Sequence, residues 1–360
     1  MDTLLADPRG IGDPSQPTSR LPAQNERLAA LDLGTNNCRL LVAEVRNGGF
    51  VVIDSFSRIV RLGEGLAHSD RLSDAAMSRT IAALKICARI IERNGATHVR
   101  CVATEACRRA LNGATFIARV QRAVGLSFEI LGQDEEARLA MLGCLPLVDP
   151  KAERLLMLDI GGGSSEVMYL DRHAGPDGRP HGLTASLPVG VVTLSETHAR
   201  SPAEMAGLWQ PAAFERMVAD VAMRLDQATA DWPGLDGPGA GRWQMLGTSG
   251  TVTTLAALHL GLRRYDRRRV DGMWLSFAAI AKAAADLRNL NDQDRAGHPC
   301  IGQGRADLVV AGCAILEAIR RRWPVTSLRV ADRGLREGIL SALMGQTLQE
   351  AMLPQGPALR

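Results

Sequence analysis

Two segments of this chain share a pattern in which a short apolar run ends in an aspartate and passes into a glycine turn. The longer one, residues 155–170, reads LLMLDIGGGSSEVMYL. Its apolar flanks are typical of two buried strands joined by a tight hairpin. A tight turn needs neither three glycines nor an aspartate at its entrance. We interpret the extra glycines as bare backbone that can approach an anion, with phosphate as the first candidate.

The same pattern occurs 127 residues earlier, where Asp32-Leu-Gly-Thr corresponds to Asp159-Ile-Gly-Gly. Hydroxyl side chains follow the glycine in both copies. Such a repeat predicts two related halves that face each other. A third turn, MLGTSGTVTTLAAL at residues 245–258, passes from a strand into a helix rich in Ala and Leu. The N-terminus of that helix is another potential anion site.

Periodicity and capping residues predict alternating strands and helices around these turns. We expect loose tails at residues 1–25 and 351–360, a first lobe at 26–150, and a second lobe at 151–350 whose C-terminal helices return to support the first. The predicted strands lie at 27–45 (two, joined by the first turn), 50–60, 98–104, 127–131 and 155–170 (two). The predicted helices lie at 73–95, from 105 onward, 116–124, 134–145, 305–322 and 334–349.

Composition restricts the class of protein. The chain is 46% hydrophobic, which allows a large buried core, and its net charge of +3 is too small to imply a nucleic-acid or membrane partner. Seven cysteines form no CxxC pair, which favours a reducing cytoplasm. The N-terminal residues lack the basic start and the apolar core typical of a signal peptide, and no run of about 18 apolar residues occurs. We therefore expect a cytoplasmic protein.

None of the three turns matches a Walker loop or a dinucleotide-binding fingerprint. Seven segments of the chain instead resemble, in order, the motifs of the Ppx/GppA family of exopolyphosphatases and guanosine pentaphosphate phosphatases. They are DLGTNNCRLLVAEV, ATEACRRALNG, DEEARLAMLG, LDIGGGSSEVMYL, LPVGVVTL, LGTSGTVTTLAAL and ADRGLREGIL. The resemblance covers roughly residues 27–345. It implies an α/β fold with two actin-like lobes, as in acetate kinase, sugar kinases, Hsp70 and actin. Each lobe would have a ribonuclease H-like mixed sheet flanked by helices.

The resemblance also assigns roles to individual residues. Glu136 matches the catalytic carboxylate that activates the attacking water, and Arg108 matches an arginine that binds phosphate. Asp159 and Glu166 resemble carboxylates associated with Mg²⁺, and Asp32 would be a third, acting through water. The implied phosphate cradle consists of Gly34, Thr35, Asn36, Gly161, Gly162, Gly163, Ser164, Ser165, Thr248, Ser249 and Gly250.

From the residues alone, plainer interpretations stay open. Glu135 and Glu136 would be favourable at any helix N-terminus, Asp32 and Asp159 are ordinary turn formers, and Arg108 would suit an exposed helix face. The first loop carries Thr35 and Asn37 where the family commonly has two serines. Glu105 or Ala106 stands where the family usually has Ser or Thr. These departures affect the expected substrate preference. We also expect this short form to lack the C-terminal HD-type domain of longer relatives.

The segment LRRYDRRRVDG at residues 262–272 holds five arginines within 263–269. A solvated helix end is the ordinary explanation of such a run. Polyphosphate is a candidate ligand for it, and nucleic acid fits the charge equally well.

The leading hypothesis is a Mg²⁺-dependent phosphohydrolase that releases terminal orthophosphate from inorganic polyphosphate, from guanosine pentaphosphate to give the tetraphosphate, or from both. One alternative is a kinase of the same fold. Another is a non-catalytic sensor that binds guanosine tetraphosphate. Nucleic-acid binding is the least favoured option, and a homodimer is kept as a candidate assembly.

Overall fold

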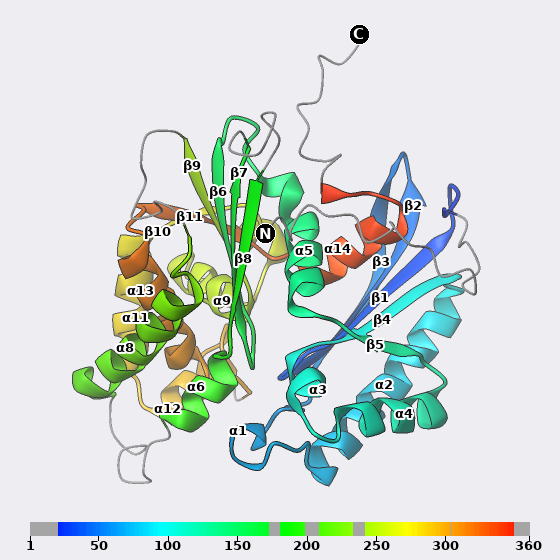
Figure 1. Ribbon diagram of the computed structural model, residues 1–360, viewed down its shortest axis with the longest axis horizontal. Helices are drawn as coiled ribbons and strands as arrows, with labels where there is room; N and C mark the ends of the chain where they lie inside the picture. Colours follow the sequence, from blue (N-terminus) through cyan, green and yellow to red (C-terminus); the bar gives the residue numbers. More distant parts are fainter. Residues whose placement is uncertain (1–20, 173–180, 199–208, 233–241, 303, 349–360) are drawn as a thin grey trace.

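The computed structural model describes residues 21–172, 181–198, 209–232, 242–302 and 304–348. Two mixed sheets face each other across helices α5 (Gln133–Cys144) and α14 (Leu335–Leu343) (Figure 1). The predicted tails therefore lie largely outside the described residues. All seven cysteines are buried and free. None of the described helices is long and apolar enough to cross a membrane.

The first sheet has the strand order β3-β2-β1-β4-β5. Strands β1, β2 and β3 form an antiparallel meander, and β4 and β5 continue parallel to β1. These strands are β1 (Arg27–Leu33), β2 (Asn37–Arg46), β3 (Gly49–Ile59), β4 (His98–Ala103) and β5 (Phe128–Ile130).

The second sheet repeats this arrangement. Its order is β10-β11-β9-β6-β7-β8, in which β6, β7 and β8 form the meander and β9 and β11 run parallel to β6. The repeat predicted from Asp32 and Asp159 therefore extends over five strands in each half. The strands are β6 (Arg154–Ile160), β7 (Ser165–Asp171), β8 (His181–Leu187), β9 (Trp243–Thr248), β10 (Trp274–Ser276) and β11 (Ser327–Ala331).

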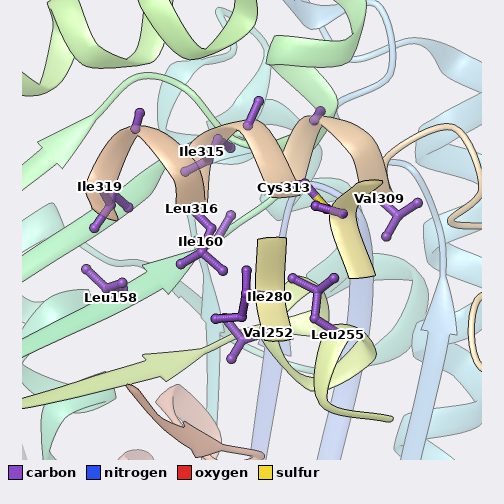
Figure 2. Packing of buried hydrophobic residues seen from close by; sticks show 14 of the residues in the cluster. Leu158, Ile160, Val252, Leu255, Ile280, Val309, Cys313, Ile315, Leu316 and Ile319 are labelled. Carbon is purple, nitrogen blue, oxygen red and sulfur yellow. The ribbon is translucent and has the colours of Figure 1, made fainter. Parts of the chain in front are cut away.

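Helices cover the outer faces of both sheets. The first sheet is covered by α1 (Leu66–Ser69), α2 (Asp74–Asn94), α3 (Glu105–Arg109) and α4 (Gly113–Val124). The second is covered by α6 (Val191–Thr197), α8 (Pro211–Ala228), α9 (Gly250–His259), α10 (Arg267–Val270), α11 (Phe277–Arg288), α12 (Asp292–Gly297) and α13 (Val309–Arg322). Figure 2 shows the core of this second layer, where Leu158 and Ile160 of β6 pack against Ile315, Leu316 and Ile319 of α13.

Local sequence explains the longest helix of the first lobe. The Ser73 hydroxyl accepts a hydrogen bond from the Ala76 amide and caps the start of α2, and Gly95 ends the helix with a left-handed φ of 61°. The helix predicted from Glu105 onward is instead broken into α3 and α4. Asn112 lies in the break, where its side-chain amide accepts from Leu72 N (2.8 Å) and donates to Leu72 O (3.0 Å).

The space between the sheets is filled by α5 (Gln133–Cys144), the short 3-10 helix η2 (Leu145–Leu147) and α14 (Leu335–Leu343) (Figure 1). Helix α5 contributes Leu139 to the core under the first sheet and Met141 to the core under the second. Helix α14 contacts β1, β2 and β4. Helix α13 packs instead against α6, α8, α9 and α11, so only the last of the two C-terminal helices lies against the first sheet.

Helices α5 and α14 cross at two glycines. A Cβ atom on Gly338 would lie 1.7 Å from the Leu139 carbonyl oxygen, and one on Gly143 would lie 2.0 Å from the Gly334 carbonyl oxygen. Backbone therefore touches backbone at the crossing. This contact sets how closely α5 can approach α14.

Candidate active site

Strand alternation brings the two repeated aspartates to the same space. In β1, Leu28 and Ala30 face the core beneath α14, so Asp32 continues that inner face. In β6, Leu155 and Met157 face the core beneath α5, so Asp159 also points inward. The two aspartates therefore face the gap between the sheets from opposite sides.

Most of the predicted site residues line a single cavity of about 650 Å³ between the two lobes. Those that line it are Asp32, Gly34, Thr35, Asn36, Glu136, Asp159, Gly161, Gly162, Gly163, Ser164, Glu166, Thr248, Ser249 and Gly250. The structure thus gathers residues from three separate turns and one helix. Their chemical roles remain predictions.

The first two turns close in the same way and touch each other. Gly34 N donates to Asn37 O, and Gly161 N donates to Ser164 O, both at 2.9 Å. A Cβ on Gly162 would lie 3.0 Å from the Thr35 Cβ and 3.2 Å from the Asn36 Cβ. The extra glycines are therefore required for packing between the turns, whether or not an anion binds there.

Helix α6 supports the second turn from behind. The Val191 and Val192 amides donate to the Gly161 and Gly162 carbonyls at 3.0 and 2.8 Å. A Cβ on Gly190 would lie 2.4 Å from the Gly162 carbonyl carbon. The turn is thus held rigidly in place with its carbonyls directed at α6.

The third turn carries local strain. Ser249 has a φ of 128°, which L-residues rarely adopt, and its hydroxyl accepts from the Thr251 and Val252 amides at the start of α9. The Thr248 hydroxyl donates to the Arg333 carbonyl at 2.7 Å. Both hydroxyls are therefore already hydrogen-bonded within the protein. Strained backbone beside a cavity is a common feature of functional sites.

Glu136 lies in the first turns of α5, which begins just after β5. This places it at the carboxyl edge of the parallel strands, where α/β folds usually bind ligands. Arg108 Nη1 donates to Glu136 Oε2 at 2.9 Å. Burial raises the pKa of Glu136 well above its usual value, Glu166 and Asp32 add to this, and Arg108 opposes it.

Two predicted phosphate contacts do not fit the structure. The buried Ser165 hydroxyl donates to the Val189 carbonyl at 2.7 Å, and Ser165 does not line the cavity, because strand alternation turns it to the opposite face of β7 from Glu166. Arg108 does not line the cavity either. Its guanidinium is engaged by carboxylates, with Glu105 Oε2 2.7 Å from Nη2.

Three arginines that the sequence analysis did not single out also line the cavity. The side chains of Arg39, Arg305 and Arg336 make no hydrogen bond or ion pair with any residue in the part of the chain that the structure describes. Arg39 lowers the pKa of both Arg305 and Arg336, after the larger effect of burial, so the three positive charges lie close together.

Only one of these arginines had a usable signal in the sequence. Arg39 pairs with Asp32 across β1 and β2, as Glu166 pairs with Asp159 across β6 and β7. Strand alternation after the first turn would therefore have placed it on the inner face. The position opposite the repeated aspartate thus carries a positive charge, Arg39, in the first half and a negative charge, Glu166, in the second. Arg305, in the turn before α13, carries no comparable local pattern.

Burial also changes the acidity of the repeated carboxylates. It raises the pKa of Asp159 to about 6, opposed by Arg39 and aided by Asp32. It raises the pKa of Glu166 to about 7, aided by Asp159 and opposed by hydrogen bonds from Ser164 (2.6 Å) and Ser186 (3.1 Å). Burial likewise raises the pKa of Asp32. The ionised carboxylates lack enough compensating positive charge.

The arginine run is divided between two environments. Arg267 Nη2 donates to Glu337 Oε1 at 2.8 Å and to the Asp332 carbonyl at 2.6 Å, so it holds α10 against the start of α14. It lines the cavity together with Tyr265. The other arginines of the run, at 263, 264, 268 and 269, are exposed. A polyphosphate contact at those four remains a prediction.

Comparisons with known proteins agree with the fold and the motifs. A model of the Ppx/GppA phosphatase family matches residues 41–347. Exopolyphosphatase 2 of Mycobacterium tuberculosis is 29% identical over 336 residues, which cover 89% of this chain and 99% of that protein. The guanosine-5'-triphosphate,3'-diphosphate pyrophosphatase of Aeromonas hydrophila is 29% identical over 319 residues, covering 88% of this chain and 59% of that protein.

Solved structures show the same relationship. The Aquifex aeolicus member of the Ppx/GppA family superposes with a TM-score of 0.70 at 28% identity, covering 89% of this chain and 98% of that one. An exopolyphosphatase-like protein superposes with a TM-score of 0.76 at 29% identity, covering 89% of this chain and 99% of that one. With the family match spanning most of its length, this chain belongs to the Ppx/GppA phosphatase family.

Proposed function

We propose that this protein is a phosphohydrolase that releases terminal orthophosphate from inorganic polyphosphate or from guanosine pentaphosphate. The observation that carries the proposal is the cavity itself, where the buried carboxylate Glu136 faces two glycine turns and three arginines without partners among the described residues. The activities named for the related exopolyphosphatase of Mycobacterium tuberculosis and the pyrophosphatase of Aeromonas hydrophila support the same reaction class.

The arginines would bind the phosphate chain. Arg39, Arg305 and Arg336 come from β2, from the turn before α13 and from α14, so three distant segments contribute to one positive cluster. Burial lowers the pKa of Arg305 and Arg336, and Arg39 adds to this, opposed only in part by Asp332, Glu337 and Asp32, so the charged arginines lack a full counter-charge. A polyanion would neutralise them, and the guanidinium fork suits phosphate oxygens. This arrangement favours phosphate chains as the substrate class.

Glu136 would act as the general base. In the proposed step, a water oxygen bonds to the terminal phosphorus while the bond to the bridging oxygen breaks. Glu136 accepts the proton of the water, and the shortened chain leaves as an anion. Arg108, which stabilises the ionised form of Glu136, would keep the base available despite its burial.

Asp159 and Glu166 are the residues that would hold Mg²⁺, with Asp32 acting through water. Their oxygen donors suit this cation, and the raised pKa values of all three carboxyl groups support the proposal, because a bound cation would stabilise their ionised forms. Within the described ranges, no three His, Cys, Asp or Glu side chains lie close enough to form a metal site alone. This fits a cation held by one or two carboxylates with water and substrate oxygens. Bound Mg²⁺ would neutralise charge on the transferred phosphate.

The test is phosphate release with Mg²⁺ by the purified protein, using long-chain polyphosphate, guanosine pentaphosphate and ATP in parallel. Glu136→Gln should reduce release by about 10²-fold or more. Glu135→Gln is the matched control, because Glu135 pairs with Arg138 and Arg100 and does not line the cavity. It should retain activity within about threefold, by the small effect of partly exposed pairs.

Three outcomes would contradict the proposal. Release that survives in Glu136→Gln would remove this residue from the reaction. Phosphate transfer that requires an added acceptor would indicate a kinase. Tight binding of guanosine tetraphosphate with no release from any substrate would indicate a sensor.

A further inference from the structure

The guanidinium of Arg108 is bound on several sides by acceptors of the described chain. Its Nε and Nη2 donate to Glu105 Oε2 at 3.2 and 2.7 Å. Its Nη1 donates to Glu136 Oε2 at 2.9 Å and to the Leu131 carbonyl at 2.7 Å. All three side chains are largely buried, with exposures of 20%, 11% and 13% for Arg108, Glu105 and Glu136.

The local structure fixes this bridge. Glu105 and Arg108 lie one turn apart on α3, so their side chains project from the same face. Glu105 also packs against the second glycine turn, where a Cβ on Gly163 would lie 3.0 Å from the Glu105 Cγ. The Leu131 carbonyl lies between β5 and α5, so it anchors the guanidinium at the entrance of the helix that carries Glu136.

Arg108 therefore differs from the arginines that face the cavity. Arg39, Arg305 and Arg336 have no described partner to lose on binding an anion. Moving Arg108 toward a phosphate would instead leave Glu105 and Glu136 buried without their counter-charge. Breaking one side of a buried ion pair in this way is strongly unfavourable.

We propose that Arg108 is a positioning residue that fixes Glu136, and that Glu105 holds Arg108 in this role and away from substrate phosphate. The inference rests on the proposed function, because it assigns Arg108 to the proposed base. It also gives a role to Glu105, which stands at one of the positions where this chain departs from the commoner Ser or Thr. Glu105 thus determines whether Arg108 serves the base or the anion.

The first test measures anion binding without turnover, by titrating inorganic tripolyphosphate into the protein in a calorimeter. Arg108→Gln should change the dissociation constant less than twofold, whereas Arg305→Gln should weaken binding by about tenfold or more, the loss expected for one charge-assisted contact. In a Glu105→Gln background, Nη1 of Arg108 keeps Glu136 and the Leu131 carbonyl, but Nε and Nη2 lose their carboxylate. These two donors can then bind the anion, so adding Arg108→Gln should now weaken binding about tenfold. Arg138→Gln, which breaks a similar i,i+3 pair outside the cavity, is the matched control.

The second test separates positioning from binding in the kinetics. Arg108→Gln should lower kcat about tenfold or more with KM within threefold, and Arg108→Lys should not restore it, because a single ammonium cannot bridge the two carboxylates as the guanidinium does. The acid limb of the kcat–pH profile should move to higher pH in Arg108→Gln. In wild type, the charge of Arg108, which Glu105 holds in place, lowers the pKa of Glu136. In the variant this charge is absent, whereas Glu166 of β7 and Asp32 of β1 still raise the pKa of Glu136, so the pKa increases.

The two tests have distinct failures. An Arg108→Gln variant that binds tripolyphosphate about tenfold more weakly, in the presence of Glu105, would overturn the inference and make Arg108 a phosphate ligand. An unshifted acid limb with normal kcat would also overturn it. A wild-type protein without any phosphate release would contradict the proposed function, while the calorimetric comparison would still decide where Arg108 binds.

Discussion

The contact between α5 and α14 allows a quantitative prediction for Gly338→Ala. The added methyl would lie 1.7 Å from the Leu139 carbonyl oxygen and 2.6 Å from its carbon, and both belong to backbone. Ordinary van der Waals contact begins at 3.4 Å. The helices must therefore separate locally by roughly 1.7 Å, because neither atom can rotate away as a side chain would.

The cost follows from what the separation exposes. Leu139, Ile339 and Leu340 are fully buried at this interface. A gap of even 0.5–1 Å loses roughly a quarter to a half of the dispersion energy of the atoms that line it. Overpacking of this kind costs about 1–3 kcal/mol, and more where backbone must move. The better helix propensity of alanine returns about 1 kcal/mol. Taking the upper end of the overpacking range, because backbone must move here, we expect a net loss of about 2 kcal/mol in the free energy of unfolding.

The measurement is urea unfolding followed by circular dichroism, with Gly297→Ala as the matched control. Gly297 is also helical, and a Cβ there meets nothing within 4 Å. That variant should stay within about 0.5 kcal/mol of wild type. A Gly338→Ala protein of wild-type stability would refute the argument, because it would mean that the two backbones are not in contact. Since α5 carries Glu136, activity should fall together with stability.

Three further predictions concern the site. Because burial raises the pKa of Glu136 in the folded protein, the stability from this group is fully present below the pKa of the unfolded side chain and is lost as pH rises through the folded value. Glu136→Gln should therefore gain thermal stability relative to wild type as the pH rises from the usual glutamate pKa of 4.5 toward the raised folded value, and a constant difference in Tm would contradict this. Ser165→Ala should cost about 1 kcal/mol, because its buried hydroxyl donates to Val189 O, with phosphate release unchanged within about twofold; a large loss of activity at normal stability would instead restore Ser165 to the cradle. Replacing Arg263, Arg264, Arg268 and Arg269 together by Gln should raise KM for long polyphosphate several-fold and leave KM for guanosine pentaphosphate unchanged. If the variant instead has the wild-type KM for both substrates, these arginines form only a solvated surface.

Local patterns predicted the elements that build the site. Apolar runs ending in Asp-x-Gly identified both hairpins, because buried strands and glycine turns have strong sequence signals. The caps at Ser73 and Gly95 fixed the ends of α2. Strand alternation also encodes the inward orientation of Arg39, which pairs with Asp32 across β1 and β2.

Long-range contacts account for what the sequence could not predict. The break between α3 and α4 depends on Asn112 binding the Leu72 backbone 40 residues earlier. The engagement of Arg108 by Glu136 joins residues 28 positions apart on different helices. Arg305 lines the cavity beside Gly250, 55 residues earlier, where an added Cβ would lie 3.8 Å from the guanidinium carbon. Neither propensity nor periodicity encodes such pairings, since they are set by tertiary packing.

The position of α14 has a consequence for biosynthesis. The first lobe is translated early, yet Ile339 and Leu340 complete the core beneath β1 and β4 only when the chain is nearly finished. Until then, Leu28, Ala30 and Val102 lack part of their cover, and the emerging lobe presents an apolar sheet face to its surroundings. Loop closure over more than 200 residues is also slow. The nascent protein should therefore depend on chaperones late in synthesis, and a ribosome that stalls before α14 would release a first lobe prone to aggregation.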